Sequence, residues 1–285
     1  MKINAISPDE SKYLQRLDEI AKTPKRLHYI GALPESPITT VAVIGTRRPT
    51  AYGKEVTHRL SYDLSKHGVL IVSGLALGVD AIAHAAALEA GGPTIAVLGN
   101  GLPKIQPATN RELAEKITRG GGAIMSEYDP NEEARPHYFL ERNRIVAGLA
   151  DAVIITEAAT RSGTLNTAAH ALEQGKEIFV VPGNITSPLS AGCNALLKQG
   201  ARVVTDYRDV LDVIAPGLSE RQARLPLGNT ELETTIINLI AGGLRDGEAL
   251  RQQTGADATE FSTALTMLEL SGAVRSLGAN QWTVS

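Results

Sequence analysis

The sequence predicts an α/β protein built on a doubly wound, mainly parallel β-sheet, followed by a small C-terminal domain. Between residues 41 and 214, short apolar runs alternate with helical patterns, which is typical of crossover units with helices on both faces of a sheet. After residue 229, three helical patterns precede two short strand patterns. That order predicts a winged-helix-like domain.

The first 39 residues have a different pattern. One short helical stretch at 12–21 is followed by Pro24, Pro34 and Pro37, which favour an extended connection. We therefore expect residues 1–39 to form an N-terminal appendage to a main domain at 40–214.

The main domain contains seven expected strands and seven expected helices. The strands are apolar runs at 41–44, 69–72, 94–98, 123–125, 152–156, 178–181 and 202–204. The helices are expected at 54–66, 81–90, 111–119, 142–149, 165–174, 191–199 and 208–214. With 285 residues and 43% hydrophobic content, the chain can bury a core of this size.

Residues 215–229 mix proline, glycine and charge without periodicity, which predicts a linker. The helices of the last domain are expected at 231–240, 247–254 and 259–270, and its strands at 273–276 and 281–284. Residues 230–285 contain three arginines and seven carboxylates, a net charge of 3 − 7 = −4. Because phosphates would be repelled on average, we expect a protein-contact or regulatory role for this domain.

Composition excludes several classes of function. No apolar run approaches the roughly 20 residues of a membrane span, and the N-terminus has no signal-peptide pattern, so we expect a cytoplasmic protein that does not contact the membrane. The single cysteine, Cys193, excludes an internal disulfide and a multi-thiolate metal site. A net charge of −3 means that any nucleic acid must be held by a local cluster of cations.

Small-residue loops follow five of the expected strands, at 45–48, 73–78, 99–101, 162–164 and 182–184. Glycines there could simply permit tight turns. Their recurrence at the edge where parallel sheets bind ligands, with arginines in two loops, favours an anion site. The loop with Arg161, Ser162, Gly163 and Thr164 precedes an expected helix, where free N–H groups and the helix dipole favour phosphate.

Several motifs occur in a characteristic order: GTRRPTAYG (45–53), SGLALGVDAIAH (73–84), ERNRIVAGL (141–149) and TEAATRSGTLNTA (156–168). Over about residues 24–214 the chain resembles the DNA-processing protein A family, DprA/Smf. The resemblance implies an extended Rossmann-like fold and a homodimer that binds single-stranded DNA. It also implies a recombination mediator that protects incoming DNA and loads the RecA recombinase in natural transformation.

The resemblance also implies that Arg47, the first arginine of GTRR, belongs to a DNA-binding pocket. Arg142 and Arg144 are expected at a helix start, where the dipole disfavours a cation. This placement indicates either an external anion or an internal ion pair with Glu141 or Glu157. The DNA-binding residues predicted in full are Gly45, Thr46, Arg47, Gly74, Gly78, Arg142, Asn143, Arg144, Arg161, Ser162, Gly163 and Thr164.

The alternative hypothesis is a nucleotide- or phosphoribosyl-binding enzyme or sensor related to the LOG-type phosphoribohydrolases. Those proteins carry GGxGTxxE with a catalytic glutamate, and Thr167 stands in its place here. A threonine lacks a carboxylate for acid–base catalysis, and the sequence has no Walker, HExxH or nucleophile-elbow motif. We therefore predict no enzymatic activity, no metal and no cofactor, although Glu157 nearby keeps the alternative open.

Overall fold

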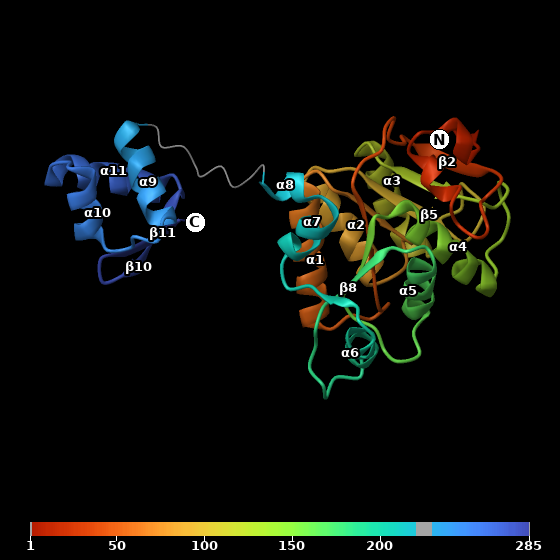
Figure 1. The fold of residues 1–285 in the computed structure, drawn as a ribbon. Coiled ribbons are helices and arrows are strands. Elements are labelled where there is room, and N and C mark those ends of the chain that lie inside the picture. Colours follow the sequence, from red (N-terminus) through yellow and green to blue (C-terminus); the bar gives the residue numbers. More distant parts are fainter. Residues whose placement is uncertain (1, 221–229, 285) are drawn as a thin grey trace. The chain divides into compact units, whose positions relative to one another are not determined.

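The computed structural model describes residues 2–220 and 230–284. The chain divides into two compact units, Met1–Pro216 and Gly217–Ser285 (Figure 1). The first is an α/β unit and the second is a winged-helix unit.

The α/β unit contains a nine-stranded sheet in the order β1-β2-β6-β5-β4-β3-β7-β8-β9. Seven of its strands are mutually parallel. They are β3 (Thr40–Ile44), β4 (Leu70–Ser73), β5 (Thr94–Leu98), β6 (Ala123–Ser126), β7 (Ala152–Ile155), β8 (Glu177–Val180) and β9 (Arg202–Val203). The chain runs outward from β3 to β6 and then returns to β7 on the other side of β3, so the order reverses between β3 and β7. In open parallel sheets such a switch point is where ligands bind.

Helices cover both faces of this sheet. They are α1 (Ala51–Lys66), α2 (Val79–Glu89), α3 (Arg111–Arg119), α4 (Pro136–Leu149), α5 (Gly163–Glu173), α6 (Ala191–Lys198) and α7 (Tyr207–Ile214). The short helix α8 (Pro216–Glu220) begins at the boundary of the two units. Side chains alternate along β5: Ile95 and Val97 join the core under α4, whereas Ala96 and Leu98 join the core under α3. This alternation follows from the two-residue period of a strand, and the doubly wound fold class is confirmed.

The N-terminal segment is part of the sheet and its core. Strand β2 (Leu27–Gly31) pairs antiparallel with β6, and β1 (Asn4–Ile6) pairs with β2. The 3₁₀ turn η1 (Pro8–Glu10) follows β1, and the segment expected to be helical at 12–21 forms only the 3₁₀ turn η2 (Leu14–Leu17). It buries Tyr13, Leu14 and Leu17 completely. Residues 1–39 thus extend the sheet rather than standing apart, because these apolar side chains complete the core beneath α4.

The winged-helix unit has α9 (Glu231–Ala241), α10 (Gly247–Thr254), α11 (Ala258–Leu270) and a hairpin of β10 (Val274–Gly278) and β11 (Gln281–Val284). Thr230, Asp246 and Asp257 cap the three helices through side-chain oxygens, as N-cap residues do. Its own apolar core includes Ile236 and Phe261. Of the predicted linker, residues 221–229 lie outside the described residues, and α8 begins within the part before them.

No helix in the described part of the chain is both long and apolar enough to cross a membrane.

Candidate nucleic-acid interface

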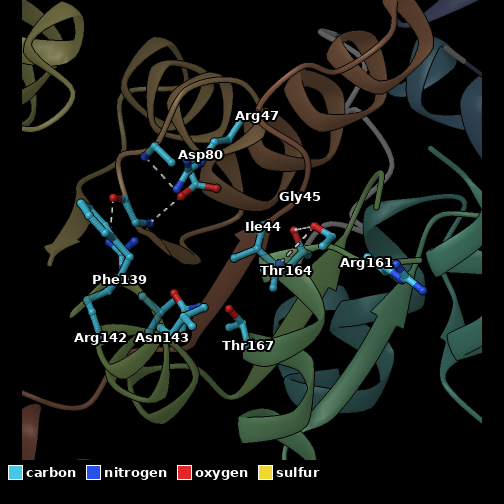
Figure 2. Close-up of a pocket in the computed structure, with 16 residues that line it drawn as sticks. Ile44, Gly45, Arg47, Asp80, Phe139, Arg142, Asn143, Arg161, Thr164 and Thr167 are labelled. Atoms are coloured by element: carbon cyan, nitrogen blue, oxygen red, sulfur yellow. Dashed lines mark hydrogen bonds between the residues drawn. The ribbon is translucent and has the colours of Figure 1, made fainter. Parts of the chain in front are cut away.

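A cavity of about 410 Å³ lies at the carboxyl ends of β3, β4 and β7, where the strand order reverses. We call it the switch-point cavity (Figure 2). It is lined by Ile44, Gly45, Arg47, Gly74, Ala76, Asp80, Phe139, Leu140, Arg142, Asn143, Val146, Arg161, Ser162, Gly163, Thr164 and Thr167. In the figure, Phe139 and Arg142 lie on one side and Thr164 and Arg161 on the other.

Two arginines at this cavity are free to meet a ligand. Arg47 follows β3 and Arg161 follows β7, and both side chains are exposed. Neither side chain forms a hydrogen bond or ion pair with any residue of the described ranges. An unpaired guanidinium offers a planar fork of donors that matches phosphate.

The beginning of α5 forms the floor next to Arg161. Ser162 is the N-cap, and its side-chain oxygen accepts a hydrogen bond of 3.2 Å from the backbone N–H of Thr164. Gly163 faces open space, with no atom within 4 Å of the position that a Cβ would occupy. A helix N-terminus open in this way favours an anion.

The loop after β4 is already occupied by a carboxylate of the chain. Asp80 Oδ2 accepts hydrogen bonds from the backbone N–H groups of Gly74 (3.0 Å) and Ala76 (3.3 Å). Those two amides are therefore not available to an external phosphate. Asp80 is buried, and burial raises the pKa of its carboxyl while the charge of Arg142 opposes the shift.

Two predicted residues shape the cavity without lining it. Gly78 has a positive φ of 78°, and a Cβ there would lie 2.5 Å from the carbonyl oxygen of Thr46. Glycine is needed because the loops after β3 and β4 approach each other closely at this point. The Thr46 N–H is bonded to the carbonyl of Glu157 at 2.8 Å, so it supports the loop rather than a ligand.

Arg142 lines the cavity but is 95% buried. Because α4 begins at Pro136, Arg142 lies in the second turn of the helix and not at its start. Its Nη1 donates to the carbonyl oxygens of Gly74 (2.7 Å) and Val97. Burial lowers its pKa to about 10, with Asp80 opposing the shift, so Arg142 is a cation at neutral pH. The neighbouring Asn143 also lines the cavity and donates to Asn166 Oδ1 at 3.1 Å.

Arg144 does not reach the cavity. Its Nη1 and Nη2 form a bidentate ion pair with Glu127 at 3.1 and 2.5 Å, with both side chains largely buried. Side chains two residues apart on an α-helix point about 200° apart around the helix axis. Arg142 and Arg144 therefore cannot face the same side of α4. The structure therefore places Arg144 outside the switch-point cavity, while its predicted contact with DNA stays a prediction; its carboxylate partner is Glu127, and neither Glu141 nor Glu157.

Glu157 supports α1. It is 2% exposed. Its carboxylate accepts hydrogen bonds from the backbone N–H (2.8 Å) and the side-chain hydroxyl (2.6 Å) of Thr50, the N-cap residue of α1. A Cβ on Gly53 would lie 2.2 Å from the Glu157 carboxylate. The carboxylate that kept an enzymatic alternative open therefore lies against a helix start, and Thr167 lines the cavity instead.

Sequence reasoning missed the role of Asp80 and a second cavity. An adjoining cavity of about 540 Å³, which we call the apolar cavity, shares Arg47 and Phe139 and is also lined by Leu77, Pro107 and Pro136. The signal for Asp80 was available, since an acidic residue directly after a glycine loop can bond that loop's amides. The predicted loops at 99–101 and 182–184 line neither cavity.

Among the residues that the structure describes, no three His, Cys, Asp or Glu side chains are grouped to hold a metal ion.

A doubly wound sheet with a cationic, glycine-lined cavity at its switch point defines a Rossmann-like protein, a class in which such cavities commonly hold phosphate-containing ligands. Comparison with known families makes the class specific. The model for "DNA recombination-mediator protein A" matches residues 4–215, and that for the "DprA winged helix domain" matches residues 220–280. The chain belongs to the DprA/Smf family of DNA recombination mediators, which confirms the resemblance found in the sequence.

Individual relatives agree with this placement. Protein Smf of Escherichia coli is 36% identical over 94% of this chain and 74% of its own length. The DNA processing protein DprA of Streptococcus pneumoniae is 42% identical over 68% of each chain, and an X-ray structure of it has a TM-score of 0.70 at 39% identity, covering 75% of each chain. The DNA processing protein A of Helicobacter pylori, for which a single-stranded DNA binding mode is described, has a TM-score of 0.67 at 33% identity over 76% of this chain and 97% of that one.

Proposed function

We propose that this protein binds single-stranded DNA in the switch-point cavity and acts as a recombination mediator. The observation that supports this most is the pair of exposed, unpartnered arginines, Arg47 and Arg161, at a cavity with an open helix N-terminus. Membership of the DprA/Smf family and the likeness to the Helicobacter pylori protein support the choice of single-stranded DNA as the ligand.

The arginines and the start of α5 would hold the phosphates of the strand. Guanidinium groups bind phosphate in a bidentate fork, and the N-terminal amides of α5 add donors without side-chain entropy cost. Phe139 lines both cavities and is the aromatic residue placed to stack on a base. The neighbouring Tyr138 is instead stacked on Tyr128, at a separation of 3.9 Å between the ring centroids.

The proposal includes a homodimer and delivery of DNA to RecA in the cytoplasm during natural transformation. These parts are supported by family membership alone. Light scattering coupled to size exclusion tests the dimer, and RecA-driven strand exchange on DNA coated with this protein tests delivery. A monomer at all concentrations would contradict the homodimer. Strand exchange that is not accelerated would contradict delivery of DNA to RecA.

Substitution of Arg47 tests the cavity. We expect Arg47→Ala to weaken oligonucleotide binding roughly tenfold, as loss of one charge-assisted hydrogen bond does. Arg47→Lys should restore only part of the affinity, because an ammonium group lacks the planar fork of donors of a guanidinium. Arg161→Ala should act in the same direction. The thermal midpoint should not change, because surface substitutions typically alter stability by no more than about 0.5 kcal/mol.

Arg48→Ala is the matched control. Arg48 is the next residue, is also exposed, and lines neither cavity, so its loss changes the net charge equally without removing a cavity donor. If folded Arg47→Ala and Arg161→Ala bind the oligonucleotide as tightly as the wild type, the cavity is not the DNA-binding site.

A further inference from the structure

Asp80 and Arg142 bind the two peptide groups on either side of Gly74. The N–H of Gly74 donates to Asp80 at 3.0 Å, and the carbonyl of Gly74 accepts from Arg142 Nη1 at 2.7 Å. Both side chains are more than 90% buried, and both line the switch-point cavity. Asp80 lies in the first turn of α2 and Arg142 lies on α4 (Figure 2), so the pair joins two helices across the cavity wall.

The loop accommodates this arrangement only with a glycine at position 74. A Cβ there would lie 2.5 Å from both Nη1 and Nη2 of Arg142, well inside van der Waals contact. The guanidinium is therefore packed flat against the Gly74 peptide, where two carbonyl oxygens, those of Gly74 and Val97, accept its Nη1 hydrogens.

The charge of Arg142 is only partly offset. No ion pair joins Arg142 to a carboxylate within the described part of the chain, and its Nε has no acceptor there. Asp80 is the carboxylate whose charge acts on it most strongly, but the two side chains form no ion pair and bind opposite sides of Gly74. Because both side chains are buried in the cavity wall, where charges are screened less than at the surface, an offset of this kind changes the potential felt by a bound phosphate.

We propose that Asp80 and Arg142 are positioning residues that set the charge of the switch-point cavity: Arg142 raises affinity for the phosphates of the strand through its field, and Asp80 limits that affinity. Asp80 also accepts the hydrogen bonds of the Gly74 and Ala76 amides, so these amides of the loop after β4 do not bind a phosphate. The proposal rests on the proposed function, because it concerns the same cavity and the same ligand.

The two residues should shift DNA affinity in opposite directions. Asp80→Asn keeps an oxygen that can accept from both amides but removes the negative charge, so a labelled oligonucleotide should bind about three- to tenfold more tightly, with a steeper dependence on salt. Arg142→Gln keeps an amide donor for the Gly74 carbonyl but removes the positive charge, and should weaken binding by a similar factor with a shallower dependence on salt. Arg142→Lys, which keeps the charge, should retain most of the affinity.

A merely structural clamp makes a different forecast. If the pair only holds the loop, both single variants bind more weakly or equally, and the salt dependence does not change in either. The double variant Asp80→Asn/Arg142→Gln separates the two explanations further. If the two charges offset each other, removing both should leave the affinity near that of the wild type. Thermal midpoints measured on the same samples show which variants are folded. If only Asp80→Asn folds, the sign of its shift decides; if only Arg142→Gln folds, its salt dependence decides, because a clamp leaves it unchanged.

Three outcomes overturn the inference: shifts of the same sign in both folded variants, unchanged affinity in Asp80→Asn, or failure of both variants to fold. Failure of the proposed function looks different, since it is read from the wild type and from Arg47→Ala. If those two bind single-stranded DNA equally or not at all, the cavity is not the DNA site. If Arg47 is required but the Asp80 and Arg142 shifts agree in sign, only the inference about charge is lost.

Discussion

The two units of this protein both have folds that can contact nucleic acid, but they distribute charge in opposite ways. In the α/β unit, Arg47 and Arg161 lie exposed and unpaired at one cavity. In the winged-helix unit, the solvent-facing side of α11 has no lysine or arginine and includes Glu260 and Glu269. Helix-turn-helix proteins place such a helix in the major groove, where these carboxylates would meet phosphates.

Two exposed apolar residues of α11 strengthen the contrast. Met267 is 50% exposed and Leu270 is 77% exposed, three residues apart on the helix, so they lie on one face. Exposed apolar residues next to carboxylates suit a protein surface better than a polyanion. The comparison teaches that fold class does not locate nucleic acid on a protein, whereas the position of unpaired cations does.

Salt should produce the largest effect on the α/β unit. If Arg47 and Arg161 neutralise two phosphates of a single strand, log affinity should fall with a slope of about −1.4 against log salt concentration, or roughly 25-fold for a tenfold rise in salt. Fluorescence anisotropy of a labelled oligonucleotide measures this directly. Affinity that does not depend on salt would contradict the assignment of the cavity by its cations.

Charge reversal on α11 should have a smaller effect and tests the other side of the comparison. Glu260→Lys combined with Glu269→Lys removes the repulsion at the helix surface, and we expect duplex DNA to bind about fivefold more tightly because two cations now face the phosphates. Electrophoretic mobility shift with a short duplex measures the change.

The control for this reversal is Glu231→Lys with Glu248→Lys, which alters the net charge equally on α9 and α10. If the control raises duplex affinity as much as the α11 variant, total charge and not the surface of α11 governs binding. If neither variant binds duplex DNA, the carboxylates of α11 are not what keeps the winged-helix unit from nucleic acid.

Much of the fold could be predicted because central parallel strands are continuous apolar runs. All seven parallel strands lie within about two residues of their expected positions, since burial on both faces leaves little choice of residue. Strands β1 and β2 were missed for different reasons. β1 has only three residues and lies at the sheet edge, and β2 lies between prolines that favoured an extended connection. Loop glycines likewise indicated where the cavity would be.

The inner wall of the cavity could not be predicted in the same way. The roles of Arg142 and Arg144 depend on α4 beginning at Pro136, six residues before the expected start, because the start fixes which side chains share a face. The occupation of the Gly74 amide by Asp80 is a tertiary contact between a loop and the helix that follows it. Sequence spacing indicates which residues are near a site, but only packing determines which of their charges remain free.

Removal of the winged-helix unit should have the smallest effect on single-strand binding. A chain ending at Pro216, the last residue of the α/β unit, keeps Arg47, Arg161, the start of α5 and the complete core beneath α4. The part removed includes an acidic segment at 230–285 whose three arginines are outnumbered by seven carboxylates, and Arg251 among them is paired with Glu248 at 2.6 Å. Its loss should therefore not weaken attraction for phosphate.

We expect the shortened chain to bind a labelled oligonucleotide within about threefold of the full chain, because long-range repulsion between exposed charges is screened beyond about 10 Å. Measurement at two salt concentrations sharpens the test, since any repulsion that is removed would appear as a gain at low salt only. Loss of most single-strand affinity in a folded shortened chain would show that local cations of the winged-helix unit, such as Arg245 and Arg275, outweigh its net charge. The free cations of the switch-point cavity would then not be sufficient to hold the strand.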